Sequence, residues 1–162
     1  MNIKQYLDST YLKTAAQAGL SENENKEVVT AAIQEAIEND FKLIMIRPEF
    51  VKLAKEMIQN ANSKVTVGTV IDFPKGESSV EEKISEANRA IQDNVDDLDF
   101  VVDYEAFKRG EIDYVKNQVL QCTKLGLSHG KIVKWIIEVA ALTNEEIVRL
   151  SALIKNVVLA NF

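Results

Sequence analysis

Apolar residues recur along this chain at two spacings, one typical of amphipathic helices and the other typical of short buried strands. The helical spacing predicts helices over residues 21–39, 49–60, from 79 onward, 104–108, 112–125 and 143–154. Runs rich in Val, Ile and Leu predict strands over residues 43–46, 65–71, 98–102, 132–139 and 157–162. Because strands alternate with helices, the pattern predicts βαβ units with right-handed crossovers and a parallel sheet, which defines the α/β class.

Some of the predicted helices begin with the spacing of a capping box. In this motif a Ser or Thr and a Glu three residues later satisfy each other's backbone N–H groups. The pairs with this spacing are Ser21 with Glu24, Ser79 with Glu82, and Thr143 with Glu146.

The last predicted strand covers Val157 to Phe162, and nothing follows it in the sequence. Buried parallel strands are normally followed by a turn and a covering helix, because their edges and ends would otherwise stay exposed. We therefore expect residues 1–162 to be a single domain that is incomplete at its C-terminal end, the front part of a larger α/β domain.

Two architectures fit this order of elements. A flavodoxin-like open sheet with helices on both faces would fit 162 residues, whereas a complete β/α barrel needs about 250 residues. Length alone therefore favours the open sheet, but the chemistry of the strands favours the barrel.

Charged residues occupy one face of two predicted strands. Asp99 lies between the apolar Leu98 and Phe100, while Lys134 and Glu138 share one face of the 132–139 strand. An open sheet covered by helices on both sides should be apolar on both faces. We therefore predict a TIM-type (β/α) barrel with the charged faces pointing inward, of which this chain supplies about the first five strands.

If these two strands are neighbours, Asp99 and Lys134 approach each other inside the barrel. Burying either charge alone would cost several kcal/mol, so we expect the two to pair. Two interpretations stay open at this point. The pair is either a core ion pair without a chemical role or part of a functional site, where perturbed titratable groups tend to cluster.

Composition excludes several classes of function. The formal charge of −6 and the pI near 4.9 argue against a nucleic-acid partner or a polybasic membrane partner. No stretch approaches the roughly 18 apolar residues of a membrane helix, and the N-terminus lacks the apolar region of a signal peptide. Cys122 is the only cysteine, which excludes a disulfide framework and a thiolate metal site. We expect a cytoplasmic protein.

Several segments together match the motifs of one known family, in that family's order. Residues 97–103, followed by Ala106, Lys108 and Gly110-Glu111, are similar to the region around its third strand. The other matches are residues 7–13 ("D-H-T-x-L-K"), 46–48 with 53–55, 69–76 ("T-V-I-G-F-P-x-G"), 134–138 ("K-V-I-I-E"), and 142–143 with 145–146. Together these segments resemble the deoxyribose-phosphate aldolase family.

The resemblance implies a β/α barrel and a class I aldolase that uses neither metal nor organic cofactor. Such an enzyme reversibly cleaves 2-deoxyribose 5-phosphate to glyceraldehyde 3-phosphate and acetaldehyde through a lysine Schiff base. The resemblance places the proton-shuttling aspartate at Asp99 and a lysine beside the site at Lys134. It places Asp8 and Thr10 near the barrel floor. The expected partners are a phosphorylated sugar or aldehyde substrate and a second copy in a homodimer.

The matched motifs and the charged strand faces give a full set of expected site residues. Asp99 is the catalytic residue, and the site-lining residues are Lys134, Asp8, Thr10, Thr69 and Glu138.

The Schiff-base lysine itself belongs to a "D-F-[IV]-K-T-S-T-G" motif of the family. Asn161-Phe162 matches its first two positions, and the 162 residues stop before its lysine. A second lysine, which keeps the first partly neutral in the family, would also lie further on. The rival interpretation is therefore a non-catalytic, shortened half-barrel that binds or assembles.

The sequence also departs from the family's motifs. Ser9 stands at the usual histidine, Met45 at a cysteine, Asp72 at a glycine and Asp103 at an asparagine. None of these changes removes a catalytic group.

Overall fold

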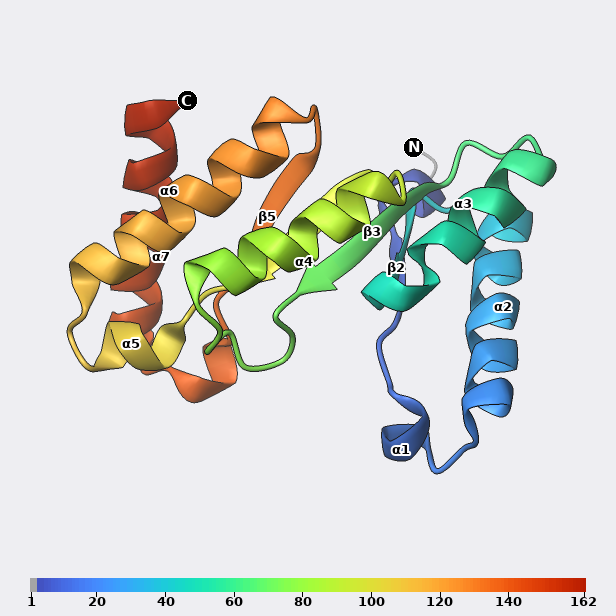
Figure 1. Ribbon diagram of the computed structural model, residues 1–162, viewed down its shortest axis with the longest axis horizontal. Helices are drawn as coiled ribbons and strands as arrows, with labels where there is room; N and C mark the ends of the chain where they lie inside the picture. The colour runs from blue at the N-terminus through green and yellow to red at the C-terminus, as the bar shows by residue number, and fades with distance from the viewer. Residues whose placement is uncertain (1–2) are drawn as a thin grey trace. The chain divides into compact units, whose positions relative to one another are not determined.

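The structure, a computed structural model, describes residues 3–162, in which helices and strands alternate (Figure 1). The strands are β1 (Asp8–Tyr11), β2 (Leu43–Ile46), β3 (Thr66–Ile71), β4 (Asp97–Val101) and β5 (Ile132–Ile136). The α-helices are α1 (Ala15–Ala18), α2 (Glu22–Asn39), α3 (Val51–Asn60), α4 (Val80–Gln92), α5 (Tyr104–Lys108), α6 (Ile112–Ser128) and α7 (Asn144–Asn161). Short 3-10 turns are η1 (Ile3–Tyr6), η2 (Pro48–Phe50) and η3 (Val139–Ala141).

The five strands form one parallel sheet in the order β1-β2-β3-β4-β5. In the register of the sheet, Asp8 of β1 lies opposite Leu43 of β2, and Leu43 lies opposite Thr66 of β3. A doubly wound sheet reverses its strand order at a switch point, and this order contains no reversal. The sequential order confirms the predicted barrel type, here an incomplete barrel of five strands.

The chain divides into two compact units. The first unit comprises the residues up to Thr69 together with Ala90–Asp97. In it, α2 contacts β1, β2 and α3 (Figure 1). The fully buried Ile33 of α2 and Ile44 of β2 belong to the core of this unit.

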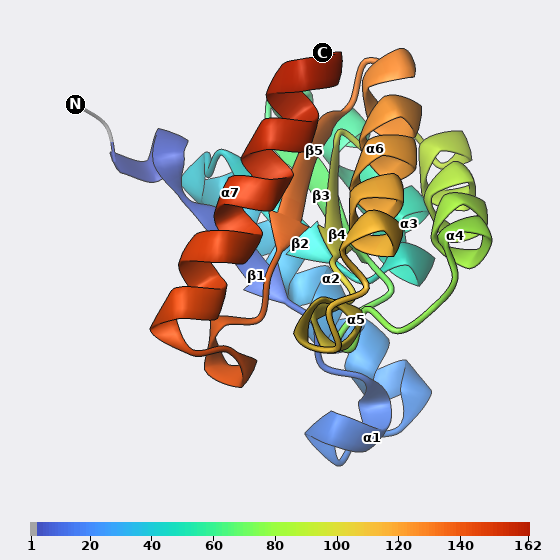
Figure 2. The ribbon, with the colours of Figure 1, turned by 90° about the vertical axis from the view of Figure 1, so that its left-hand side faces the viewer.

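The second unit comprises Val70–Arg89 and Leu98–Phe162. Here α6 contacts β5, α5 and α7, all of which are visible in Figure 2. Its core includes Val102, Phe107, Val119 and Leu150, with Trp135 packed against them. This unit carries most of the chemistry described below.

The predicted helix starts are confirmed. Ser21 and Glu24 cap α2, and Thr143 and Glu146 cap α7, each pair with both hydrogen bonds of a capping box. Ser79 and Glu82 make the same two bonds at the start of α4, where the Glu82 backbone N–H donates to Ser79 Oγ over 3.2 Å. None of the helices among residues 3–162 is both long enough and apolar enough to span a bilayer.

The predicted final strand is wrong: residues 157–161 are the last turns of α7. A short apolar run cannot be assigned to strand or helix by periodicity alone. Here Leu150, Ile154 and Val157 continue the helical spacing, and neither Gly nor Pro interrupts the helix before the run. The fifth strand is instead β1, which the sequence did not predict because its residues, Asp8–Tyr11, form no apolar run.

Candidate functional site

The predicted ion pair lies on two neighbouring strands of the second unit. Lys134 Nζ of β5 is 3.3 Å from Asp99 Oδ1 of β4. The Asp99 side chain is 15% exposed and that of Lys134 is 38% exposed, so the carboxylate is the more enclosed partner. A half-buried carboxylate held beside an ammonium group is suited to accepting and returning a proton.

The opposite faces of the same strands are anchored on the helices. Phe100 stacks on Trp135 with 5.3 Å between ring centroids, and Trp135 Nε1 donates to Thr123 Oγ1 of α6 over 3.1 Å. Beyond the ion pair, the Val102 backbone N–H donates to Ile136 O over 3.0 Å. These contacts fix the spacing and register of β4 and β5, and the apolar face packs on helices.

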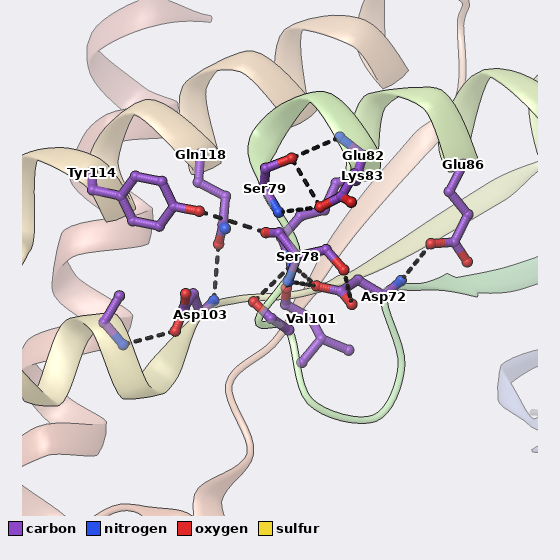
Figure 3. Close-up of polar contacts among 12 residues, drawn as sticks. Asp72, Ser78, Ser79, Glu82, Lys83, Glu86, Val101, Asp103, Tyr114 and Gln118 are labelled. Carbon is purple, nitrogen blue, oxygen red and sulfur yellow. Dashed lines mark hydrogen bonds and ion pairs between the residues drawn. The ribbon is translucent and has the colours of Figure 1, made fainter.

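A buried lysine lies at the carboxyl ends of β3 and β4 (Figure 3). The side chain of Lys83 in α4 is fully buried and forms an ion pair with Asp72. Its Nζ also donates to the backbone oxygens of Gly76 and Val101, each over 2.9 Å. All three donors of the ammonium group are therefore used, which is what a buried charge requires.

Asp72 joins this lysine to the loop that follows β3. Asp72 has φ of +56°, a left-handed conformation that Gly or Asn adopts more easily. Its carboxylate accepts hydrogen bonds from Ser78 N over 2.9 Å and from Ser78 Oγ over 2.8 Å. Its backbone N–H donates to Glu86 over 3.0 Å, and burial raises the pKa of Glu86.

The same loop lies directly against the end of β4. Gly76 has φ of +72°, and a Cβ atom there would overlap Val102 O. The Phe73–Pro74 peptide bond is cis. The positive φ of Gly76 and its close approach to Val102 allow the loop to take this path only with Gly at position 76.

A second group of polar residues lies beside this network (Figure 3). The Asp103 carboxylate accepts a bond from Ala106 N over 2.7 Å and so caps α5, while Asp103 N donates to Gln118 Oε1 over 2.9 Å. Tyr114 Oη lies 3.5 Å from Ser78 O. Burial, followed by the negative charge of Asp103, raises the pKa of Tyr114.

Comparison with known proteins identifies the family. No protein-family model matches the chain. A deoxyribose-phosphate aldolase of Thermococcus kodakarensis is 39% identical over 153 residues, covering 94% of this chain and 65% of that protein. One of Clostridium botulinum is 35% identical over 155 residues, covering 96% of this chain and 68% of that protein. This chain belongs to the deoxyribose-phosphate aldolase family.

Solved structures agree with this assignment. A Coccidioides immitis protein provisionally named deoxyribose-phosphate aldolase superposes with a TM-score of 0.83 at 28% identity, covering 96% of this chain and 57% of that one. The tetrameric deoxyribose phosphate aldolase of Aeropyrum pernix superposes with a TM-score of 0.80 at 22% identity, and the match covers 96% of this chain and 60% of that one. The second likeness shows the fold alone. The chain thus spans about two thirds of the curated family members it matches.

Of the site residues expected from the family motifs, Asp99 and Lys134 are brought together. Glu138 lies in the same unit just before η3, with φ of +52° and a half-buried side chain. Its negative charge contributes to the raised pKa of Tyr104, of which burial is the main cause.

The other expected residues belong to the first unit. Asp8 and Thr10 are exposed residues of β1, and Thr10 Oγ1 donates to Asp8 O over 3.3 Å. Thr69 is fully buried in β3 and donates through Oγ1 to Ile46 O over 2.8 Å. Their relation to Asp99 stays a prediction.

Sequence reasoning missed Lys83. A usable signal existed, because Val80, Lys83, Ala87 and Ala90 are spaced three or four residues apart along α4. All four are buried, so the lysine occupies a position on the apolar face of the helix.

A cysteine nucleophile and a bound metal ion are two alternatives to chemistry at the ion pair. Burial raises the pKa of Cys122 to about 12, so its thiol stays protonated and is a poor nucleophile. Within residues 3–162, no three His, Cys, Asp or Glu side chains are grouped so that they could hold a metal ion.

Proposed function

We propose that this chain carries the proton-shuttling part of a class I aldolase that reversibly cleaves 2-deoxyribose 5-phosphate to glyceraldehyde 3-phosphate and acetaldehyde. The observation that carries the proposal is the Asp99–Lys134 ion pair, at 3.3 Å on adjacent strands. Membership of the deoxyribose-phosphate aldolase family supports the reaction and favours it over a non-catalytic binding protein.

The proposed chemistry begins at a lysine amine, which condenses with the substrate aldehyde and releases water. The C2–C3 bond then breaks, its electron pair moves toward the iminium nitrogen, and the C3 hydroxyl gives up a proton. Glyceraldehyde 3-phosphate leaves, the enamine is protonated at C2, and hydrolysis releases acetaldehyde.

In this scheme Asp99 accepts the hydroxyl proton and returns it through water. A positioned general base of this kind contributes about 10²- to 10⁴-fold in rate. Lys134 holds the carboxylate in place and keeps a positive charge beside the reacting carbonyl group. Because Lys134 is the more exposed partner, it lies at the solvent side of the pair.

The Schiff-base lysine is expected in the motif whose first two positions match Asn161-Phe162. The proposed activity therefore belongs to a polypeptide or an assembly that includes this lysine. The phosphorylated substrate, the cytoplasmic location and a homodimer remain parts of the same proposal.

A chimera tests the proposal directly. Residues 1–162 are joined to the part of the Thermococcus kodakarensis relative that follows the matched region. The chimera should release acetaldehyde from 2-deoxyribose 5-phosphate, and borohydride reduction with acetaldehyde should attach an ethyl group to one lysine of the added segment. A folded chimera that forms no such adduct and releases no acetaldehyde would refute the proposal.

A further inference from the structure

The Lys83 ammonium group joins three segments of the second unit at one point. Its acceptors are the carboxylate of Asp72 at the start of the loop after β3, the carbonyl oxygen of Gly76 within that loop, and the carbonyl oxygen of Val101 at the end of β4. Figure 3 shows these segments converging beside α4. No other lysine is among the fully buried side chains of the described residues.

A simple packing role does not explain a lysine at this position. An apolar side chain of similar volume would fill the space without the cost of burying a charge. An ammonium group supplies what an apolar side chain lacks, three hydrogen-bond donors. It supplies them at the carboxyl ends of the two strands, where β3 ends at Ile71 and β4 ends at Val101.

The Val101 contact connects this point to the ion pair. Val101 is two residues beyond Asp99 on β4, and the next residue, Val102, donates its N–H to Ile136 of β5 over 3.0 Å. Ile136 is in turn two residues beyond Lys134. The end of β4 is therefore held by Lys83 on one side and by β5 on the other, immediately after the two charged residues.

We propose that Lys83 is a positioning residue for the Asp99–Lys134 pair, acting through the Val101 carbonyl, with Asp72 as its counter-charge. The functional meaning of this role rests on the proposed function of Asp99. Lys83 does not touch the reacting atoms. It fixes the carboxyl end of β4 so that the Asp99 carboxylate stays within reach of Lys134.

The test measures how fast an acylating reagent modifies Lys134 in the 162-residue protein. Pairing with Asp99 slows acylation of this amine, so Asp99→Asn sets the rate of an unpaired Lys134. The informative variant is Asp72→Asn combined with Lys83→Met, which removes both buried charges together. Lys116 is the internal control, because it forms a comparable ion pair with Asp113 at 3.2 Å on α6.

The proposal predicts that the double variant stays folded and that Lys134 acylation rises by at least half of the increase seen in Asp99→Asn, while Lys116 is unchanged. A folded double variant with wild-type acylation of Lys134 would overturn the proposal and leave Lys83 a purely structural residue. If this variant does not fold, Asp72→Asn with Lys83→Gln keeps an amide donor in the pocket and is judged by the same two outcomes. Since no step requires catalysis, failure of the aldolase proposal would be seen separately in the chimera.

Discussion

Replacing Lys83 alone with Met should destabilise the second unit strongly. The change leaves Asp72, whose side chain is 14% exposed, without its counter-charge. It also removes the donor that serves the carbonyl oxygens of Gly76 and Val101. Ser78 still donates two hydrogen bonds to the Asp72 carboxylate, so part of its solvation is retained.

The size of the effect follows from known cases. Removing one partner of a buried ion pair costs about 3–5 kcal/mol, because the remaining charge is uncompensated. For a chain of this size each kcal/mol lowers the melting temperature by about 2–4 °C. We therefore expect a drop of about 6–20 °C. Adding Asp72→Asn should recover at least half of the loss, because the uncompensated charge is then absent.

Guanidinium unfolding followed by tryptophan fluorescence measures this loss. Trp135 is the only tryptophan and lies in the same compact unit, stacked on Phe100. The midpoint should shift while the dependence of the unfolding free energy on denaturant stays constant. The reasoning would be refuted if Lys83→Met lowered the free energy of unfolding by less than about 1 kcal/mol. It would also be refuted if Lys83→Met with Asp72→Asn lowered it by as much as Lys83→Met alone.

Three further predictions concern other features of the chain. Gly76→Ala should lower the free energy of unfolding, measured with denaturant, by at least about 1 kcal/mol more than Gly110→Ala does. Both glycines have positive φ, but only Gly76 lacks room for a Cβ atom. Equal losses in the two variants would contradict the close approach at Gly76. Cys122 should react with iodoacetamide at about pH 8 only after unfolding, since burial raises its pKa to about 12; rapid labelling of the folded protein would argue against this. The capping bonds from Thr143 lower the pKa of Glu146 below 4.5, so its stabilising contribution is present above that pH and is lost on acidification through the lowered pKa. In melts between about pH 5 and pH 3, Glu146→Gln should therefore show a flatter decline than the wild type, and parallel curves would disprove the linkage.

The sequence predicted the barrel type and the Asp99–Lys134 contact for the same physical reason. Charges at alternate positions of two apolar strands must share a face, and opposite charges on neighbouring strands pair when they are enclosed. The capping boxes were equally predictable, because they depend only on residues three positions apart. Predictions of this kind depend only on neighbouring residues or on the alternation of side chains along a strand, so the rest of the fold does not change them.

Two features were missed by the reasoning from sequence. The run Val157 to Phe162 has the composition of a strand, but α7 includes all of it up to Asn161, because a helix already capped at Thr143 continues until something interrupts it. The helical spacing places Lys83 on the apolar face of α4, but its partners are two backbone carbonyls and an aspartate 11 residues away, which no sequence pattern reports.

The most direct test of the central claim is the retro-aldol rate of the chimera with and without the Asp99 carboxylate. Asp99→Asn should lower kcat for 2-deoxyribose 5-phosphate by about 10²-fold or more while borohydride still traps the acetaldehyde adduct. Asp113→Asn is the matched control, because that carboxylate is 99% exposed on α6, and it should leave kcat unchanged. A folded Asp99→Asn chimera with the kcat of the Asp113→Asn control would contradict the assignment of Asp99 as the proton shuttle.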